Sequence, residues 1–186
     1  MNQRLNWLNT LLVLFAAFLA VYWEAAFQGF HRLLGAQIDL LPPLMVYAGL
    51  SAGLSTVILL ALCGGLGFDS LSANPLGISV LPLLLVGVMI HAGRDLILRD
   101  QNFARVVLGL ATSAVVPVLT LLLLLTTSQQ PLLGWGTLWQ LLVMSVAGAV
   151  VTPLFFELFG WLLRLLGPVR ASETSFRPDR EIRRGK

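Results

Sequence analysis

The chain has 186 residues, of which 57% are hydrophobic and only 11% are charged, and its formal net charge is +3. A water-soluble domain has about a quarter of its residues charged, so this composition excludes an ordinary soluble domain. Long apolar runs without polar alternation favour helices over a membrane β-barrel. We therefore expect an all-α membrane protein, a polytopic bundle of about six short transmembrane helices.

The first predicted span covers about Leu5–Phe27, with Arg4 before it and aromatic residues at its end. Its apolar run of about 20 residues exceeds the apolar region of a secretory signal peptide. We therefore expect a retained transmembrane helix rather than a cleaved leader.

A second apolar region, Ile38–Phe68, would form one helix of about 46 Å, although the hydrocarbon core is only about 30 Å thick. The small residues of Gly49–Gly53 interrupt it, so we divide it into helices at about Ile38–Leu50 and Ala52–Phe68. The first of these is too short to span comfortably, and we expect it to be either partly re-entrant or packed against protein.

Three further spans are predicted at about Leu76–Leu98, Phe103–Leu125 and Leu138–Leu166. Together the spans make one transmembrane domain over residues 1–166. The polar, basic tail 167–186 is expected to be disordered or to lie on the membrane surface. Nucleic-acid binding is not expected, because the tail follows a membrane anchor and carries little aromatic interleaving.

Lys and Arg placement predicts the orientation, because cytoplasmic loops are enriched in these residues. Two basic groups are separated by two spans, whereas the connections Asp69–Pro75 and Thr126–Thr137 contain no Lys or Arg. We therefore expect a cytoplasmic C-terminus. Charge alone does not separate five spans from six, but helix length favours six, which also places the N-terminus in the cytoplasm. The basic groups are Arg94, Arg99 and Arg105, and Arg164, Arg170, Arg177, Arg180, Arg183, Arg184 and Lys186.

Asp69 is the most informative polar residue, because a carboxylate at the edge of the hydrocarbon is costly unless it is hydrated, caps a helix or meets a partner. It could simply end the third span, with Ser72 or Asn74 capping the next helix. Alternatively, Asp69, Ser72, Asn74 and Pro75 could form a rigid loop that packs against or is recognised by a partner. The two readings are compatible.

Three other acidic residues are candidates for intramembrane or interfacial polar sites. Glu157 lies inside the last predicted span, where it is either functional or paired with Arg164 or another basic group near the cytoplasmic end. Glu24 and Asp39 flank the first connection and could form a structural cluster with Arg32. Asp39 could instead line a polar pocket.

Catalytic and metal-binding patterns are not found in the sequence, so we expect no enzymatic activity, catalytic residue, metal or cofactor. His91 and Asp95 share a helix face, but an interfacial charged patch explains them better than proton transfer or metal binding. The single cysteine, Cys63, is expected to be a buried packing thiol.

Small residues recur at four-residue spacing, which allows helices to approach closely in lipid. The pairs are Gly49 with Gly53, Gly109 with Ser113, and Gly148 with Thr152. Packing within the chain is the simplest explanation.

The stretch Gly67–Gly77 resembles the D-x-x-S-x-x-P-L-G turn of the bacterial rod shape-determining protein MreD family. The matching residues are Gly67, Asp69, Ser72, Pro75, Leu76 and Gly77. The segment Ile38–Tyr47 also resembles the second helix of that family, although Pro42 and Pro43 and the long tail depart from the pattern.

The resemblance implies a non-enzymatic inner-membrane scaffold or regulator of cell shape. Its architecture would be similar to the substrate-binding subunits of energy-coupling-factor transporters. It would act with the transmembrane segment of MreC, and indirectly with MreB, RodA and the transpeptidase partner of RodA, in lateral peptidoglycan synthesis by the elongasome. The alternative is the membrane-embedded substrate-binding subunit of a transporter for a vitamin-like molecule, with Asp39 and Asp69 near its ligand.

Overall fold

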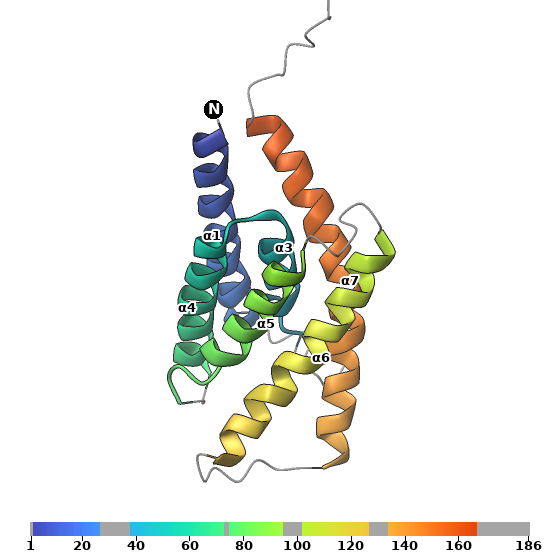
Figure 1. The fold of residues 1–186 in the computed structure, drawn as a ribbon. Coiled ribbons are helices and arrows are strands. Elements are labelled where there is room, and N and C mark those ends of the chain that lie inside the picture. The colour runs from blue at the N-terminus through green and yellow to red at the C-terminus, as the bar shows by residue number, and fades with distance from the viewer. Residues whose placement is uncertain (1, 27–37, 73–74, 95–101, 127–133, 167–186) are drawn as a thin grey trace, which may run out of the picture.

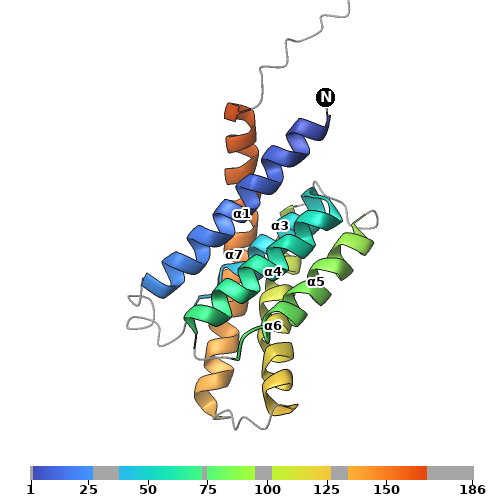
Figure 2. The same cartoon turned by 90° about the vertical axis from the view of Figure 1, so that its left-hand side faces the viewer.

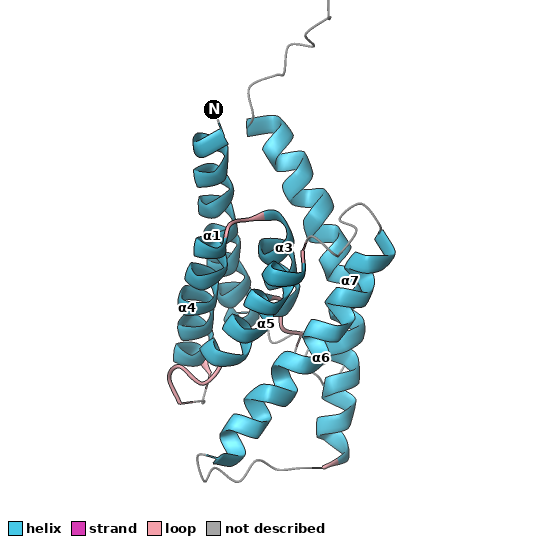
Figure 3. Cartoon of the chain, in the orientation of Figure 1, coloured by secondary structure: helices cyan, strands magenta, loops and turns pink. Residues whose placement is uncertain are grey.

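A computed structural model describes residues 2–26, 38–72, 75–94, 102–126 and 134–166. Within these ranges the protein is all-helical and contains no strand, which confirms the predicted all-α bundle (Figures 1 and 3). The six helices are α1 (Asn2–Ala26), α3 (Leu41–Ser51), α4 (Leu54–Leu71), α5 (Val80–Gly93), α6 (Asn102–Thr126) and α7 (Trp135–Leu166).

The predicted division of the long apolar region 38–68 is confirmed. Helix α3 ends at Ser51, and the extended backbone at Ala52 and Gly53 turns the chain into α4. The Ala52 N–H donates to the carbonyl of Ala48 at 2.9 Å, which closes the last turn of α3.

Helix α3 forms the centre of the bundle. Every residue from Leu41 to Leu50 is buried, and the helix contacts each of the other five (Figures 1 and 2). A helix of 11 residues rises only about 16 Å, so it is too short to cross a membrane alone. Its sides are covered by the other helices, so of the two expectations for it, packing against protein is the one observed.

Four helices are long and apolar enough to cross a membrane, namely α1, α4, α6 and α7. The start of α1 and the end of α7 lie at the same end of the molecule, while the α4–α5 turn lies toward the opposite end (Figure 1). This arrangement agrees with the six-helix reading of the sequence.

Helices α6 and α7 form a long antiparallel pair held by the predicted small residues (Figure 1). A Cβ added to Gly109 would lie 2.5 Å from the carbonyl oxygen of Gly148, and one added to Gly148 would lie 2.5 Å from the Cβ of Ser113. The two helices therefore touch through their backbones, and this spacing serves packing within the chain.

Two details differ from the expectations. Gly49 packs against Ile90 of α5, but Gly53 has open space around its Cα, so these glycines do not form one helix-packing motif. Cys63 is exposed on α4 rather than buried, because Gly64 and Gly65 occupy the inward face of that turn. An apolar surrounding sequence does not separate inward from lipid-facing positions.

Candidate functional site

The turn between α4 and α5 is built around the carboxylate of Asp69. This residue lies in the last turn of α4 and is only 1% exposed. Its Oδ2 accepts hydrogen bonds from the backbone N–H of Gly77 at 2.8 Å and of Ser79 at 3.1 Å. Hydrogen bonds to a carboxylate are stronger than neutral ones, and a negative charge is favoured at a helix N-terminus. Asp69 therefore caps α5 from the preceding helix.

The glycines of the turn allow this geometry. Gly77 adopts φ +91°, a conformation that costs little for glycine and more for any other residue. Gly65 allows α4 to approach the start of α5, because a Cβ there would lie 2.9 Å from the Cα of Val80.

Most of the remaining residues of the family-like stretch lie at the same turn. The Ser72 hydroxyl donates to the carbonyl of Asp69 at 3.4 Å, and the Pro75 carbonyl accepts from the N–H of Ile78 at 3.3 Å. Leu76 is 71% exposed. Gly67 lies one turn earlier on α4, facing Val21 of α1. The structure thus brings Ser72, Pro75 and Leu76 into the turn of Asp69 and Gly77, with Leu76 exposed, whereas Gly67 lies within α4.

Two buried oxygens of this turn have no hydrogen-bond partner among the described residues, the Oδ1 of Asp69 and the Oγ of Ser79. Most buried polar atoms are satisfied by protein or by ordered water. Both atoms belong to residues that the bond from the backbone N–H of Ser79 to Oδ2 holds at the same turn.

Asp39 lies just before α3 and caps it. Its Oδ1 accepts from the N–H of Leu41 at 2.9 Å, which satisfies one of the free donors at the start of the helix. Burial raises the pKa of Asp39 to about 6, although the hydrogen bond from Leu41 acts in the opposite direction. Its role in this structure is that of a cap.

The other predicted acidic sites are separate from Asp69 and Asp39. Glu24 is half-buried in the last turn of α1, and Arg32, its expected partner, lies outside the described residues. Glu157 is exposed on α7, and no ion pair connects it to Arg164, so the expected pairing with Arg164 is not observed. The two residues are about two helical turns apart, which is too far for a direct contact.

His91 contacts the end of α3. Its Nδ1 lies 3.2 Å from the carbonyl oxygen of Gly49, one of the last carbonyls of that helix. Asp95, which shares its predicted helix face, lies outside the described residues. Within the described ranges, no group of three or more His, Cys, Asp or Glu residues could hold a metal ion.

A buried polar and aromatic cluster around Tyr47 was not predicted. The Tyr47 hydroxyl of α3 donates to Oδ1 of Asn9 in α1 at 3.1 Å, and its ring stacks on Phe159 of α7 with centroids 4.4 Å apart. Phe156 meets the Tyr47 ring edge-on at 5.1 Å, and the Arg105 guanidinium lies 4.5 Å from the Phe156 centroid. The one signal in the sequence was an asparagine inside the first apolar span.

Comparison with protein-family models, with curated proteins and with solved structures found no match for this chain.

Proposed function

We propose that this chain is a non-enzymatic inner-membrane scaffold of the MreD type, which regulates cell shape together with MreC during lateral peptidoglycan synthesis. MreB, RodA and the transpeptidase partner of RodA would be reached indirectly. Both termini would lie in the cytoplasm, on the side of the basic tail.

The observation that carries the proposal is the buried Asp69 carboxylate bound to the backbone of Gly77 and Ser79. Asp69 and Gly77 occupy the aspartate and glycine positions at the two ends of the D-x-x-S-x-x-P-L-G pattern. Their direct contact gives that spacing a physical reason, since the aspartate holds the turn that the glycine makes possible. The sequence resemblance thus involves residues that act together.

The packing of α3 favours a scaffold over a solute-binding subunit. The centre of the described bundle is filled by α3, whose Leu44, Val46 and Ala48 side chains are 0% exposed. Asp39 and Asp69, the two residues expected near a vitamin-like ligand, each cap a helix instead.

The surface that meets MreC would lie on the exposed helix faces. The small residues of α6 and α7, which could have formed an open groove, are occupied by contacts between those two helices. Large exposed apolar side chains are found on every described helix except α3, and those of α1 include Phe15 and Phe18.

The test is complementation in a rod-shaped bacterium whose own MreD gene is deleted, with a tagged chain and tagged MreC. The native chain should restore rod shape and recover MreC after detergent extraction. Asp69→Ala should lose both. Ser70→Ala is the matched control, because Ser70 is exposed and, among the residues that the structure describes, its hydroxyl donates only to the carbonyl of Gly67.

Protein level in the membrane must be measured in parallel, so that loss of function is separated from loss of folded chain. Failure of the native chain to restore rod shape and to recover MreC, at normal membrane level, would contradict the proposal. Recovery of an ATPase and a retained solute would instead support the transporter alternative.

A further inference from the structure

The turn between α4 and α5 exposes leucine side chains. Leu71 at the end of α4, Leu76 in the turn and Leu81 in the first turn of α5 are 60%, 71% and 59% exposed. The sequence has no Asp, Glu, Lys or Arg from position 70 to position 90, and the carboxylate that precedes this stretch is buried. The exposed surface of the turn is therefore uncharged and rich in large apolar side chains, which is typical of a surface that meets a membrane or an apolar partner.

Backbone polar groups of this turn bond within the turn. The N–H groups of Gly77 and Ser79 donate to the Oδ2 of Asp69 at 2.8 and 3.1 Å. The N–H of Ile78 donates to the carbonyl of Pro75 at 3.3 Å. Hydrocarbon offers no water to an unpaired backbone group, so internal bonds of this kind are what a turn needs at membrane depth.

The two serine hydroxyls at the end of α4 are also bonded internally. Ser70 donates to the carbonyl of Gly67 at 2.8 Å, and Ser72 donates to the carbonyl of Asp69 at 3.4 Å. Ser70 is exposed, yet its hydroxyl is directed back at its own helix. The exposed serine thus has a partner for its hydroxyl without any contact with water.

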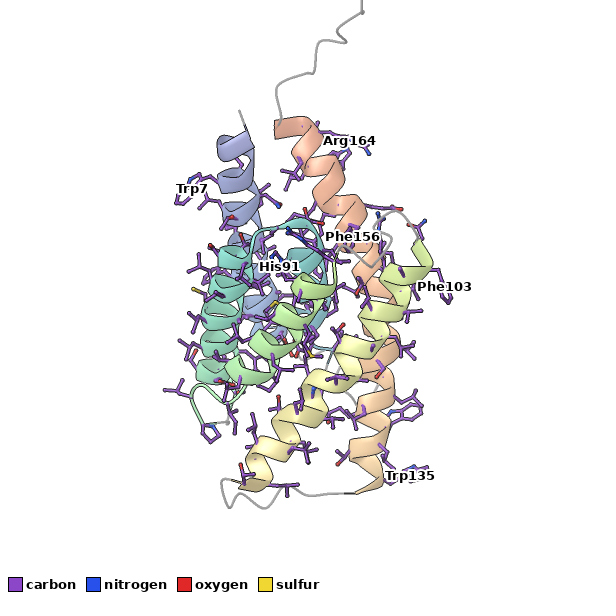
Figure 4. The ribbon with its side chains drawn as sticks, in the orientation of Figure 1. Trp7, His91, Phe103, Trp135, Phe156 and Arg164 are labelled. Atoms are coloured by element: carbon purple, nitrogen blue, oxygen red, sulfur yellow. The ribbon has the colours of Figure 1, made fainter. Side chains whose placement is uncertain are left out.

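The start of α7 marks the membrane interface on this side of the molecule. Trp135 and Trp139 are 85% and 50% exposed, and amphipathic aromatic rings of this kind are favoured at the interface. Figure 4 shows Trp135 beyond the α4–α5 turn, at the end of the molecule opposite Arg164, and Figure 2 shows the start of α7 beyond the turn from a second side. The 14 residues of α5 rise about 21 Å, which is less than the hydrocarbon thickness of about 30 Å.

We propose that the α4–α5 turn is inserted into the hydrocarbon of the leaflet away from the N-terminus, where Leu71, Leu76 and Leu81 contact acyl chains. The partner of this surface is lipid, because the turn exposes leucines, carries no exposed charge and bonds its polar groups internally. The insertion holds whether or not the chain takes part in cell-shape control. A protein that recognises Leu76 must then do so with a membrane-embedded segment.

The test measures the depth of a nitroxide label on the full chain in phosphatidylcholine vesicles. Cys63 is the single cysteine, so a Cys63→Ala chain accepts one label at Leu76→Cys. Collisions with oxygen report hydrocarbon, and collisions with a water-soluble nickel chelate report water. Leu122→Cys on α6, 53% exposed, is the hydrocarbon reference. Gly134→Cys, exposed just before α7 with no atom within 4 Å of its Cβ, is the aqueous reference.

We expect the label at Leu76 to collide with oxygen as often as the label at Leu122 does, and to lose the nickel collisions seen at Gly134. Nickel collisions equal to those at Gly134 would place the turn in water and overturn the proposal. Few collisions with both reagents would also overturn it, because a second copy of the chain would then cover the turn.

A second label at Leu71→Cys keeps the test independent of one substitution. Leu71 lies on the other arm of the turn and is exposed, so it should give the same collision pattern as Leu76. Helix content measured by circular dichroism should equal that of the native chain in both variants, since neither side chain is buried. Opposite patterns at the two positions would contradict insertion of the whole turn.

Discussion

The carboxylate Oδ2 of Asp69 lies 2.8 Å from the backbone nitrogen of Gly77, and this bond joins the end of α4 to the turn that starts α5. Ser79, the residue just before α5, makes no side-chain cap of its own. The cap of α5 is therefore supplied from another helix, which couples the formation of the two helices.

Replacing Asp69 with alanine should destabilise the fold. It removes the acceptor for the N–H groups of Gly77 and Ser79, and these would remain inside the protein without a partner. We expect a loss of about 3–6 kcal/mol in the free energy of unfolding, since two bonds are lost and hydrogen bonds to charged groups contribute about 1.5–3 kcal/mol each. This loss in the free energy of unfolding is measured by unfolding the purified native and variant chains in mixed micelles. Ser70→Ala should change stability by less than about 0.5 kcal/mol.

Replacing Gly77 with alanine tests the backbone of the same turn. No atom lies within 4 Å of a Cβ added at Gly77, so the cost comes from φ +91° alone. We expect about 1–2 kcal/mol of destabilisation. Gly53→Ala is the matched control, because its site is also open but its φ is −80°, and it should be neutral or slightly stabilising. Equal effects in both variants would contradict this account of the turn.

Most of the architecture could be predicted from the sequence, because the hydrocarbon core limits the length of an apolar helix. Because of that limit the apolar region 38–68 was divided into two helices near Gly49–Gly53, and the structure has α3 and α4 on either side of this division. The central position of α3 could not be predicted, since a short apolar helix has the same composition whether protein or lipid surrounds it. Cys63 was placed wrongly for the same reason.

The candidate site was located by sequence, but its bonds were not. The spacing from Asp69 to Gly77 and Ser79 is outside the range of local capping rules, which pair a side chain with an N–H two or three residues later. The bond forms because α4 and α5 pack side by side. Likewise, nothing in the sequence connects Asn9 with Tyr47, which are 38 positions apart and meet only through the packing of α1 on α3.

Replacing Gly148 with alanine should separate α6 from α7. The new Cβ would lie 2.5 Å from the Cβ of Ser113 and 2.8 Å from the carbonyl oxygen of Gly109, so the helices must move apart. Overpacking of this kind costs about 1–3 kcal/mol. Gly160→Ala, on the same helix but with no atom within 4 Å, should be neutral or stabilising. Thermal unfolding in detergent compares the two, and a similar loss in both would show that close approach is not the cause.

Replacing Tyr47 with phenylalanine should weaken the contact between α3 and α1. The stacking on Phe159 is kept, but Oδ1 of Asn9 loses the Tyr47 hydroxyl as its donor. An unsatisfied buried acceptor costs about 1–3 kcal/mol. The double variant with Asn9→Leu should recover part of that loss, because it removes the orphaned group. The free energies of unfolding of the single and double variants give the coupling energy between Tyr47 and Asn9. Purely additive effects would show that the hydrogen bond between them does not contribute to stability.

Asp39 should make stability depend on pH. Its pKa rises from 3.8 to about 6 on folding because burial disfavours the charged form. The folded chain therefore holds a proton that the unfolded chain releases within this range, and stability from this group falls as pH rises from 3.8 to about 6. Above about pH 6 the carboxyl group is charged in both states, and the stability that it contributed is fully lost.

Asp39→Asn removes this dependence while keeping an oxygen that can accept from the N–H of Leu41. The variant should be more stable than the native chain at neutral pH and should lose the decline between pH 3.8 and about 6. Thermal midpoints in detergent, recorded from about pH 4 to about pH 8, show the difference between the two curves. Parallel curves would mean that Asp39 does not carry the proton, whereas convergence at the acidic end is the expected pattern, because both side chains are then neutral.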